Sequence, residues 1–357
     1  MPRLKKVDPG GPGITRRRRG RGWQYLDEDG RKVDDPEVVA RIQTLAIPPA
    51  WQDVWISVEA MGHIQATGTD AAGRKQYRYH DKWRERRDAE KFESMILFAK
   101  ALPRLRKRVA RDLDAQDELG RERVLACATR LLDKGFFRVG SEGYAEENET
   151  YGLATILKSH VTIDGSAMRF DYAAKGNKRR VQRVSDPDIA GLVETLKRRR
   201  SGGDELLAYK RGSRWVDVKS ADVNEYLKAA AGGDFTAKDF RTWNATVLAA
   251  LALAPSGEAA MASKTARKRA VKRAIDETAR YLGNTPAVCR ASYIDPRVFD
   301  RFHGGLTIGG VLPELVDPDT DWPEIQPTIE AGVLALIAGD REDEAVEKGP
   351  VVEDAAA

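Results

Sequence analysis

The chain has 357 residues, a length that favours two or more domains over one. Charged residues make up 32% and hydrophobic residues 41%, so the chain can bury a core and is not wholly disordered. Its longest apolar run, residues 247–254, falls far short of the ~18 residues that a membrane span needs, and no apolar stretch follows the basic N-terminus as in a secretory signal. We therefore expect a cytoplasmic protein without membrane contact.

Positive charge is distributed unevenly along the chain. The net charge is +5, but residues 340–357 carry seven acidic and two basic side chains, so the chain before them carries +10. Residues 1–22 carry eight Lys or Arg and one Asp, with four consecutive arginines at residues 16–19. We predict a flexible basic arm over residues 1–22 and a disordered acidic tail over residues 340–357. A polyanionic partner explains the basic clusters, and solubility alone explains them about as well.

A small sheet-rich domain is predicted for residues 23–85. A short helix is expected after Asp35-Pro36, because this pair is typical of a helix N-terminus. Hydrophobic alternation between turn residues predicts three short strands, at residues 54–58, 63–68 and 77–79.

A larger, mainly helical domain is predicted for residues 86–339, after a highly charged segment at residues 81–88 that we interpret as a hinge. The helical pattern is interrupted once, at residues 161–184. There the residues alternate, and the turn signals Asp-Gly at 164–165 and Gly-Asn at 176–177 predict a three-stranded β meander. After the meander we predict helix again to about residue 282. The fold class is therefore α+β.

The usual catalytic constellations are missing from the sequence. The four histidines have no metal-ligand spacing, and no Walker, GxGxxG or GxSxG motif occurs. Cys127 and Cys289 lie far apart within predicted helices, which fits neither a disulfide framework nor a zinc site and is typical of a reducing compartment. Charge and composition alone thus predict only a basic protein that binds nucleic acid.

Four stretches of the sequence contain residues that could act in catalysis. They are Phe-Phe-Arg-Val-Gly at 136–140, with Tyr144 and Glu-Asn-Glu-Thr-Tyr-Gly-Leu at 147–153; Lys175 in the turn after Phe-Asp-Tyr; Lys-Asp-Phe-Arg-Thr-Trp-Asn-Ala-Thr at 238–246; and Leu-Gly-Asn-Thr-Pro-Ala-Val-Cys-Arg-Ala-Ser-Tyr-Ile-Asp-Pro at 282–296. An Arg–Lys–Arg–Tyr set in this order and with these flanks resembles type IB DNA topoisomerases, most closely the small bacterial and poxvirus branch. The resemblance covers about residues 23–310.

The resemblance implies a fold and an activity. The fold is a small N-terminal domain joined to a catalytic domain that tyrosine recombinases share. The activity is relaxation of supercoiled duplex DNA. A tyrosine attacks a phosphodiester, forms a 3′-phosphotyrosine link, frees a 5′-hydroxyl and later reverses the reaction. ATP is not needed, because one phosphodiester is exchanged for another. No metal cofactor is expected, because fixed cations can stabilise the transition state.

The resemblance also implies roles for individual residues. Tyr293 matches the nucleophile, and Arg138 and Arg241 match the arginines that stabilise the phosphorus-centred transition state. Lys175 matches the general acid on a hairpin turn; the residues alone leave Lys178 open as an alternative. Asn284 stands where poxvirus and eukaryotic members have histidine, and it can donate a hydrogen bond but carries no charge.

Contacts to DNA are expected from both domains. Gln76, Tyr77 and Tyr79 resemble the DNA-contacting strand of the family's small domain, and Tyr144 is expected near the scissile strand or against Arg138. The expected partner is double-stranded DNA, bound by a monomer that clamps around the duplex in the nucleoid.

Two other functions remain open at this point. A tyrosine site-specific recombinase shares the fold and the nucleophile, but such enzymes usually carry His-x-x-Arg at the second arginine. Here Lys238, Asp239 and Phe240 precede Arg241, which argues against that function. A non-catalytic nucleoid protein with this fold would bind DNA without any phosphotyrosine bond.

Overall fold

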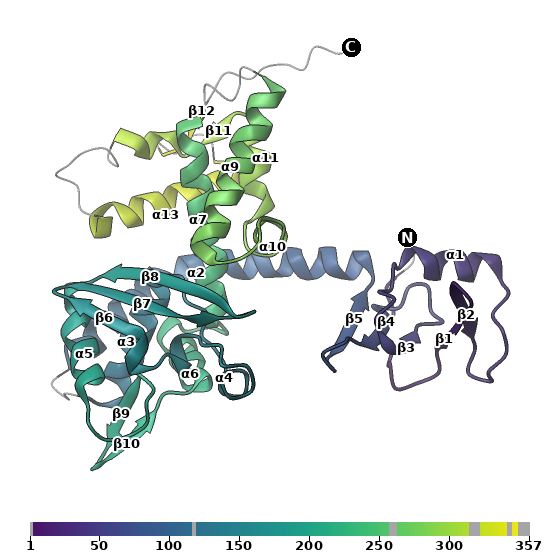
Figure 1. Cartoon of the computed structure of the whole chain (residues 1–357). Coiled ribbons are helices and arrows are strands. Elements are labelled where there is room, and N and C mark those ends of the chain that lie inside the picture. Colours follow the sequence, from purple (N-terminus) through teal and green to yellow (C-terminus); the bar gives the residue numbers. More distant parts are fainter. Residues whose placement is uncertain (1–2, 116–118, 257–262, 314–321, 341–344, 349–357) are drawn as a thin grey trace. The chain divides into compact units, whose positions relative to one another are not determined.

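The computed structural model describes residues 3–115, 119–256, 263–313, 322–340 and 345–348. The chain divides into two compact units, residues 1–92 and 93–357 (Figure 1). Within the described ranges, no helix combines the length and the apolar character that crossing a bilayer requires.

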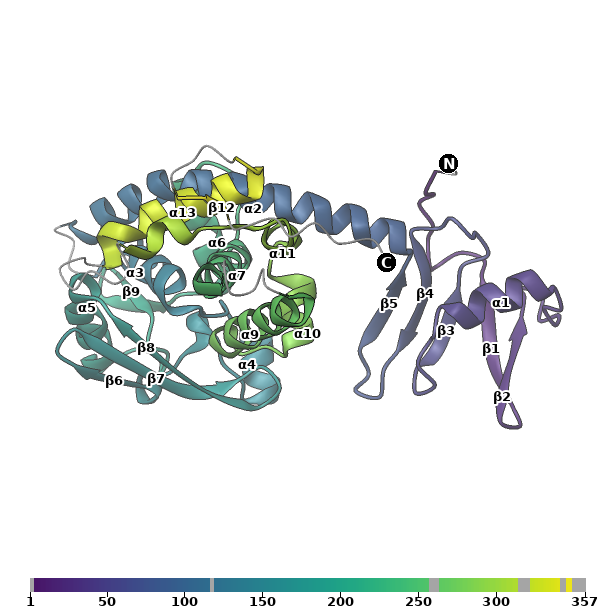
Figure 2. The same ribbon diagram turned by 90° about the horizontal axis from the view of Figure 1, so that it is seen from above.

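The N-terminal unit is built on a five-stranded antiparallel sheet with strand order β2-β1-β3-β4-β5. Its strands are β1 (Ile14–Arg19), β2 (Gly22–Leu26), β3 (Gln52–Ile56), β4 (Ile64–Thr69) and β5 (Lys75–Tyr79). Helix α1 (Pro36–Thr44), capped by the Asp35 side chain as predicted, lies against one face of the sheet (Figure 2). The buried core between them consists of Ile14, Ile42, Val54, Ile56 and Ala66.

The prediction of a flexible arm over residues 1–22 is wrong for β1. The run of arginines lies in this strand, which pairs with β2 through the turn at Gly20-Arg21 and with β3 at Ile14. The guanidinium of Arg16 donates to three backbone carbonyls in the segment after α1 and stacks on the Trp23 ring at 4.1 Å. These contacts stabilise the positive charge of Arg16 within the sheet. The composition of the segment does not reveal them, because the partners lie elsewhere in the chain.

The predicted hinge at residues 81–88 is also wrong. Helix α2 (Asp81–Leu113) begins there, and the division into units falls after Phe92, inside this helix, rather than after residue 85. Its charged residues pair along the helix: Glu90 accepts from both Arg86 and Arg87, and Lys91 pairs with Asp88. Such pairs at three- and four-residue spacing support a solvated helix, so a charged segment need not be a loop.

The second unit is mainly helical and contains the predicted meander. Strands β6 (Val161–Asp164), β7 (Ala167–Ala174) and β8 (Lys178–Ser185) form an antiparallel sheet in this order, which confirms the prediction. Helices α3 (Arg121–Gly135) and α5 (Pro187–Arg198) pack beside it (Figure 1). A short hairpin, β9 (Ala208–Arg211) and β10 (Arg214–Asp217), lies in a segment that the sequence predicts as helical.

The remaining elements complete the unit. They are α4 (Glu142–Asn148), α6 (Ser220–Ala231), α7 (Ala237–Leu253), α9 (Lys264–Leu282), α10 (Pro286–Ser292), α11 (Pro296–His303), α13 (Trp322–Ala338), β11 (Leu306–Thr307), β12 (Glu347–Lys348), and the 3₁₀ turns Leu153–Thr155, Lys158–His160, Ala254–Ser256 and Gly309–Val311. Most of the predicted acidic tail, 340–357, lies outside the described residues. Within it, however, β12 pairs with β11, so disorder is the wrong prediction for that strand.

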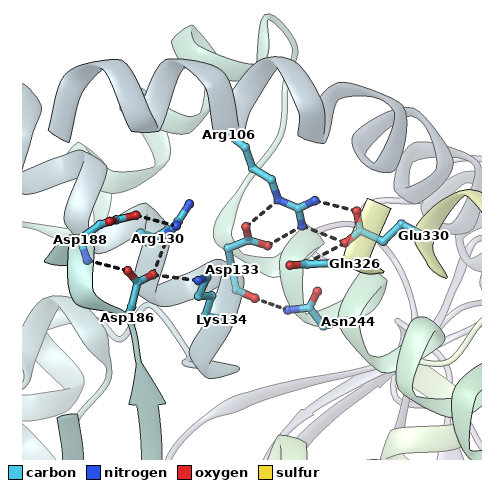
Figure 3. Close-up of polar contacts among 9 residues, drawn as sticks. All are labelled: Arg106, Arg130, Asp133, Lys134, Asp186, Asp188, Asn244, Gln326 and Glu330. Carbon is cyan, nitrogen blue, oxygen red and sulfur yellow. Dashed lines mark hydrogen bonds and ion pairs between the residues drawn. The ribbon is translucent and has the colours of Figure 1, made fainter. Parts of the chain in front are cut away.

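Helix α3 is fixed by buried ion pairs on two sides (Figure 3). Arg106 of α2 makes paired hydrogen bonds to Asp133 of α3, at 2.8 and 2.9 Å, and to Glu330 of α13, at 2.6 and 2.8 Å. Farther along, Asp186 accepts from Arg130 and pairs with Lys134. Burial lowers the pKa of Arg106, but its hydrogen bonds to the two carboxylates outweigh burial and raise it overall. The end of α3 is therefore held rigidly, which matters because it leads directly into the candidate site.

Replacing Arg106 by Met is expected to destabilise the protein strongly. The change leaves Asp133 and Glu330 buried without their cation, and such a loss typically costs about 3–5 kcal/mol of unfolding free energy. Urea denaturation measures it. The control is Lys272→Met, which breaks an exposed pair with Asp276 on α9 and should cost no more than about 0.5 kcal/mol. Equal losses for the two variants would contradict a stabilising role for the network.

Candidate active site

The turn after α3 carries Arg138. Helix α3 ends at Gly135, and Phe136 caps it with a left-handed backbone, φ 57°. Phe137 is buried edge-on against Phe170, ring centroids 4.9 Å apart, so the next side chain along this extended segment points away from the core. Two residues later Gly140, φ 87°, approaches Gly152 so closely that a Cβ on Gly140 would lie 2.9 Å from the Gly152 Cα. This crossing requires glycine and shapes one wall of the site.

Lys175 lies at the tip of the hairpin between β7 and β8. Strand pairing closes at Ala174 and Lys178, and Gly176 and Asn177 adopt positive φ in the turn, as the Gly-Asn signal predicts. The Lys175 side chain is exposed. It is free to reach a ligand.

Neighbouring cations on this hairpin have other partners. Arg179 makes two hydrogen bonds to Asp171, at 2.8 and 2.7 Å, and these hold the pKa of Asp171 at about 2. Arg180 donates to the backbone carbonyls of Arg280 and Tyr281. Lys178 is exposed but does not line the cavity described below.

Arg241 lies on the second turn of α7. Asp239 caps this helix by accepting from Thr236 N at 2.8 Å and Thr236 Oγ1 at 3.0 Å. The Arg241 side chain is only 4% exposed, and it donates to the carbonyls of Phe136 at 2.7 Å and Leu282 at 3.0 Å. Burial, with the nearby charge of Arg138, lowers the pKa of Arg241 to about 10.

Tyr293 caps the C-terminus of α10. Thr285 caps the start of this short helix, and Tyr293 N donates to Cys289 O at 3.0 Å. Thr246 of α7 fixes the turn that follows: its Oγ1 donates to Thr242 O at 2.9 Å, accepts from Asp295 N at 3.1 Å and lies 3.4 Å from Tyr293 O. Both Tyr293 and Arg241 are thus positioned by α7.

The four residues predicted for catalysis meet at one cavity of about 470 Å³. Its lining includes Arg138, Lys175, Arg241 and Tyr293, which come from four separate segments of the sequence. The guanidinium of Arg241 lies 5.2 Å from the centre of the Tyr293 ring. Burial raises the pKa of Tyr293, but the charges of Arg241 and Arg138, together with hydrogen bonding from Arg241 and Asn284, outweigh burial and lower it below its ordinary value.

Asn284, the fifth residue predicted for the catalytic site, contacts Arg138 and is not among the residues that line the cavity. Its Oδ1 accepts a hydrogen bond from Arg138 Nη2. Its Nδ2 is buried, and its contact with the Tyr293 phenol does not have the geometry of a well-formed hydrogen bond. The contact still helps to lower the pKa of Tyr293. Asn284 therefore positions an arginine.

Three arginines converge on the C-terminus of α9. Arg138 donates to Gly283 O at 3.1 Å, Arg241 to Leu282 O, and Arg180 to two further carbonyls of the last turn. Unpaired carbonyls and the negative end of the helix dipole favour cations there. In the sequence Arg180 is one of several basic residues that follow the hairpin turn. Its positioning contact has no signature in the sequence, because the helix end that it binds lies 100 residues away.

The predicted DNA contacts of the N-terminal unit separate onto two faces of β5. Tyr77 and Tyr79 are 42% and 38% exposed, with rings stacked 5.9 Å apart. Gln76 points to the other face and donates to Asp70 at 2.9 Å, so the structure does not bring it together with the tyrosines. Tyr144 lies on α4, and its side chain is outside the described part of the structure.

Comparison with known proteins gives a consistent family. A family model described as eukaryotic DNA topoisomerase I, catalytic core, matches residues 80–302, and one described as bacterial DNA topoisomerase IB, N-terminal domain, matches residues 22–70. DNA topoisomerase 1B of Acanthamoeba polyphaga mimivirus is 31% identical over 289 residues, which cover 79% of this chain and 85% of the viral protein.

Other relatives cover less of the chain or are more distant. DNA topoisomerase I of Monkeypox virus is 23% identical over 275 residues, 75% of this chain and 82% of that protein. DNA topoisomerase 1 of Daucus carota is 30% identical over 129 residues, 36% of this chain and only 15% of the plant protein. With the two-part fold and the converging Arg–Lys–Arg–Tyr set already described, these matches show that the chain belongs to the type IB DNA topoisomerase family.

Proposed function

We propose that this chain relaxes supercoiled duplex DNA by cutting one strand through a 3′-phosphotyrosine bond and resealing it. The observation that carries the proposal is one cavity whose lining brings Tyr293 together with four cationic residues, Arg138, Lys175, Lys238 and Arg241. In the forward step Tyr293 Oη bonds to phosphorus and the bond from phosphorus to the 5′-oxygen breaks. The phenol loses one proton and the 5′-oxygen gains one, so the exchange balances without ATP or a metal ion.

The two arginines have different roles in this proposal. Arg138 uses Nη2 for its protein contacts, and within the described residues its Nε and Nη1 make no hydrogen bond. This edge suits the non-bridging oxygens of the phosphate, whose charge grows in the transition state. Arg241 is buried and already donates to two carbonyls, so it acts mainly through its charge, on the phenolate and on the phosphorane.

Lys175 is the proposed general acid. It lines the cavity and lies on an exposed turn, whereas Arg179 is held by Asp171 and Arg180 by α9. Protonation of the departing 5′-oxygen by a positioned lysine is expected to contribute about 10²–10⁴-fold to the cleavage rate.

Removing Lys175 therefore tests the acid directly. Lys175→Ala should slow single-turnover cleavage of a normal oligonucleotide by about 10²–10⁴-fold. A substrate with sulfur in place of the 5′-bridging oxygen should restore the rate, because a thiolate leaves without a proton. Lys178→Ala, a change of the same kind three residues away, should cleave both substrates normally. If Lys178→Ala shows the defect and the sulfur rescue instead, the acid is assigned to the wrong residue.

We further propose that a monomer binds duplex DNA, with both units contacting the same duplex in the nucleoid. All four proposed catalytic side chains come from one chain, so a second copy is not needed to complete the site. Plasmid relaxation without magnesium or ATP, together with a denaturing gel for a covalent DNA adduct, tests the function. A recombinase would need paired DNA sites, and a non-catalytic DNA-binding protein would give no adduct.

A further inference from the structure

One face of the N-terminal sheet is left uncovered by α1. Residues paired across antiparallel strands point their side chains to the same face. One row of side chains therefore crosses this face from β1 to β5. It is formed by the cross-strand pairs Thr15–Trp55, Trp55–Thr67 and Thr67–Tyr77. The core residues of these strands alternate with this row and point toward α1 on the other face, so the row lies on the side opposite the helix.

The arginines of β1 are divided between the two faces. Arg17 and Arg19 alternate with Thr15 in the same register, so they share the face of Tyr77. Arg16 and Arg18 point to the α1 side. Arg16 is used there to bind the carbonyls after α1, and Arg18 is exposed.

Arg17 and Arg19 are charged, exposed and uncompensated. On β2 they stand opposite Gln24 and Gly22, neither of which is acidic. Across the described parts of the chain, neither arginine makes an ion pair, in contrast to Arg31 in the turn after β2, which pairs with Asp29. An exposed pair of unneutralised guanidiniums suits a phosphate backbone.

We propose that the β1–β2 hairpin is a second DNA contact, in which Arg17 and Arg19 bind backbone phosphates beside the segment that Tyr77 and Tyr79 contact. The inference rests on the proposed function for its DNA substrate. Strands β5 and β1 are three strand spacings apart, or about 14 Å. Thr15 stands level with Tyr77 across the sheet, and Arg17 and Arg19 lie two and four residues farther along β1, or about 7 and 14 Å. The arginines are thus about 15–20 Å from Tyr77. A major groove is about 12 Å wide, so a sheet that presents the tyrosines to the groove brings the arginines to phosphates at or beyond its border.

The strand that carries these arginines is separate from the matched family region. The bacterial N-terminal family model covers residues 22–70, and β1 ends at Arg19. The proposed contact therefore lies outside the matched range, and it assigns a function to the arginine run that the catalytic site does not use.

Salt-dependent binding tests the proposal. The full chain with Tyr293→Phe, which cannot form an adduct, is titrated onto a 30-base-pair duplex at several NaCl concentrations and followed by fluorescence anisotropy. The logarithm of the association constant falls linearly with the logarithm of the salt concentration, and each lost phosphate contact reduces the steepness of this fall by about 0.9. Adding R17A and R19A together should lower the slope by about 2 and weaken binding about tenfold to a hundredfold at 0.1 M salt.

Two further variants make the result specific. Arg18→Ala removes the same charge from the opposite face of the same strand and should leave the slope unchanged. The Arg17→Lys and Arg19→Lys pair keeps the charges and should retain the slope, which excludes misfolding as the cause. The proposal is overturned if the double alanine variant keeps the parental slope, or if Arg18→Ala alone lowers the slope by half as much as the double alanine variant. Absence of an adduct with unaltered protein would instead count against the proposed function.

Discussion

Replacement of Tyr293 by Phe should abolish plasmid relaxation and the covalent DNA adduct, with a loss of at least about 10⁴-fold. The change removes the oxygen proposed to bond to phosphorus and leaves the ring in place. The contacts that fix this turn, from Tyr293 N to Cys289 O and from Thr246 Oγ1 to Tyr293 O, use the backbone and do not need the hydroxyl. Folding and DNA binding should therefore be retained.

The control for this experiment is a second tyrosine near the site. Tyr281 is exposed at the end of α9, and Tyr281→Phe loses a hydroxyl without touching the proposed nucleophile. It should relax a plasmid at about the normal rate. Measurable relaxation by Tyr293→Phe, in the absence of magnesium and ATP, would show that another group attacks the phosphodiester.

Replacement of Arg241 should change both the rate and its dependence on pH. Removing this charge is expected to lower the cleavage rate about 10²–10³-fold at neutral pH. Arg241 helps to lower the pKa of Tyr293, so the phenolate persists to lower pH than an ordinary tyrosine allows and is lost as pH falls through that pKa. Without Arg241 the pKa of Tyr293 rises, and the pH–rate profile of Arg241→Ala should move to higher pH.

The conservative variant separates charge from structure. Arg241→Lys keeps a cation but cannot span the carbonyls of Phe136 and Leu282, so it should keep much of the pH profile while losing rate. Single-turnover cleavage across pH 6–10, with thermal melting of each variant, measures both effects. An unshifted profile for Arg241→Ala would show that its charge does not control the phenol.

Local patterns in the sequence predict much of this molecule. The Gly-Asn turn predicts the hairpin tip that carries Lys175, and Thr285-Pro286 predicts the short helix that presents Tyr293. These features depend on residues close in sequence and on the backbone conformations that Gly, Asn and Pro favour.

Features that depend on tertiary contacts are missed. The arginine run is read as a flexible arm because nothing nearby in the sequence shows that Arg16 will bind the segment after α1. The charged start of α2 is predicted as a hinge because a run of charged residues is typical of solvated loops. The sequence alone does not show that ion pairs such as Arg86 with Glu90 stabilise a helix there. At the site, motif order predicts which residues gather, but not that Asn284 binds Arg138.

The carbonyls at the end of α9 hold Arg138, Arg180 and Arg241 at one place. Fraying of that single helical turn would remove a backbone partner from all three guanidiniums at once, leaving Arg241 its contact with Phe136 O and Arg138 its contact with Asn284 Oδ1. The positions of three cations at the site therefore depend together on one turn of helix.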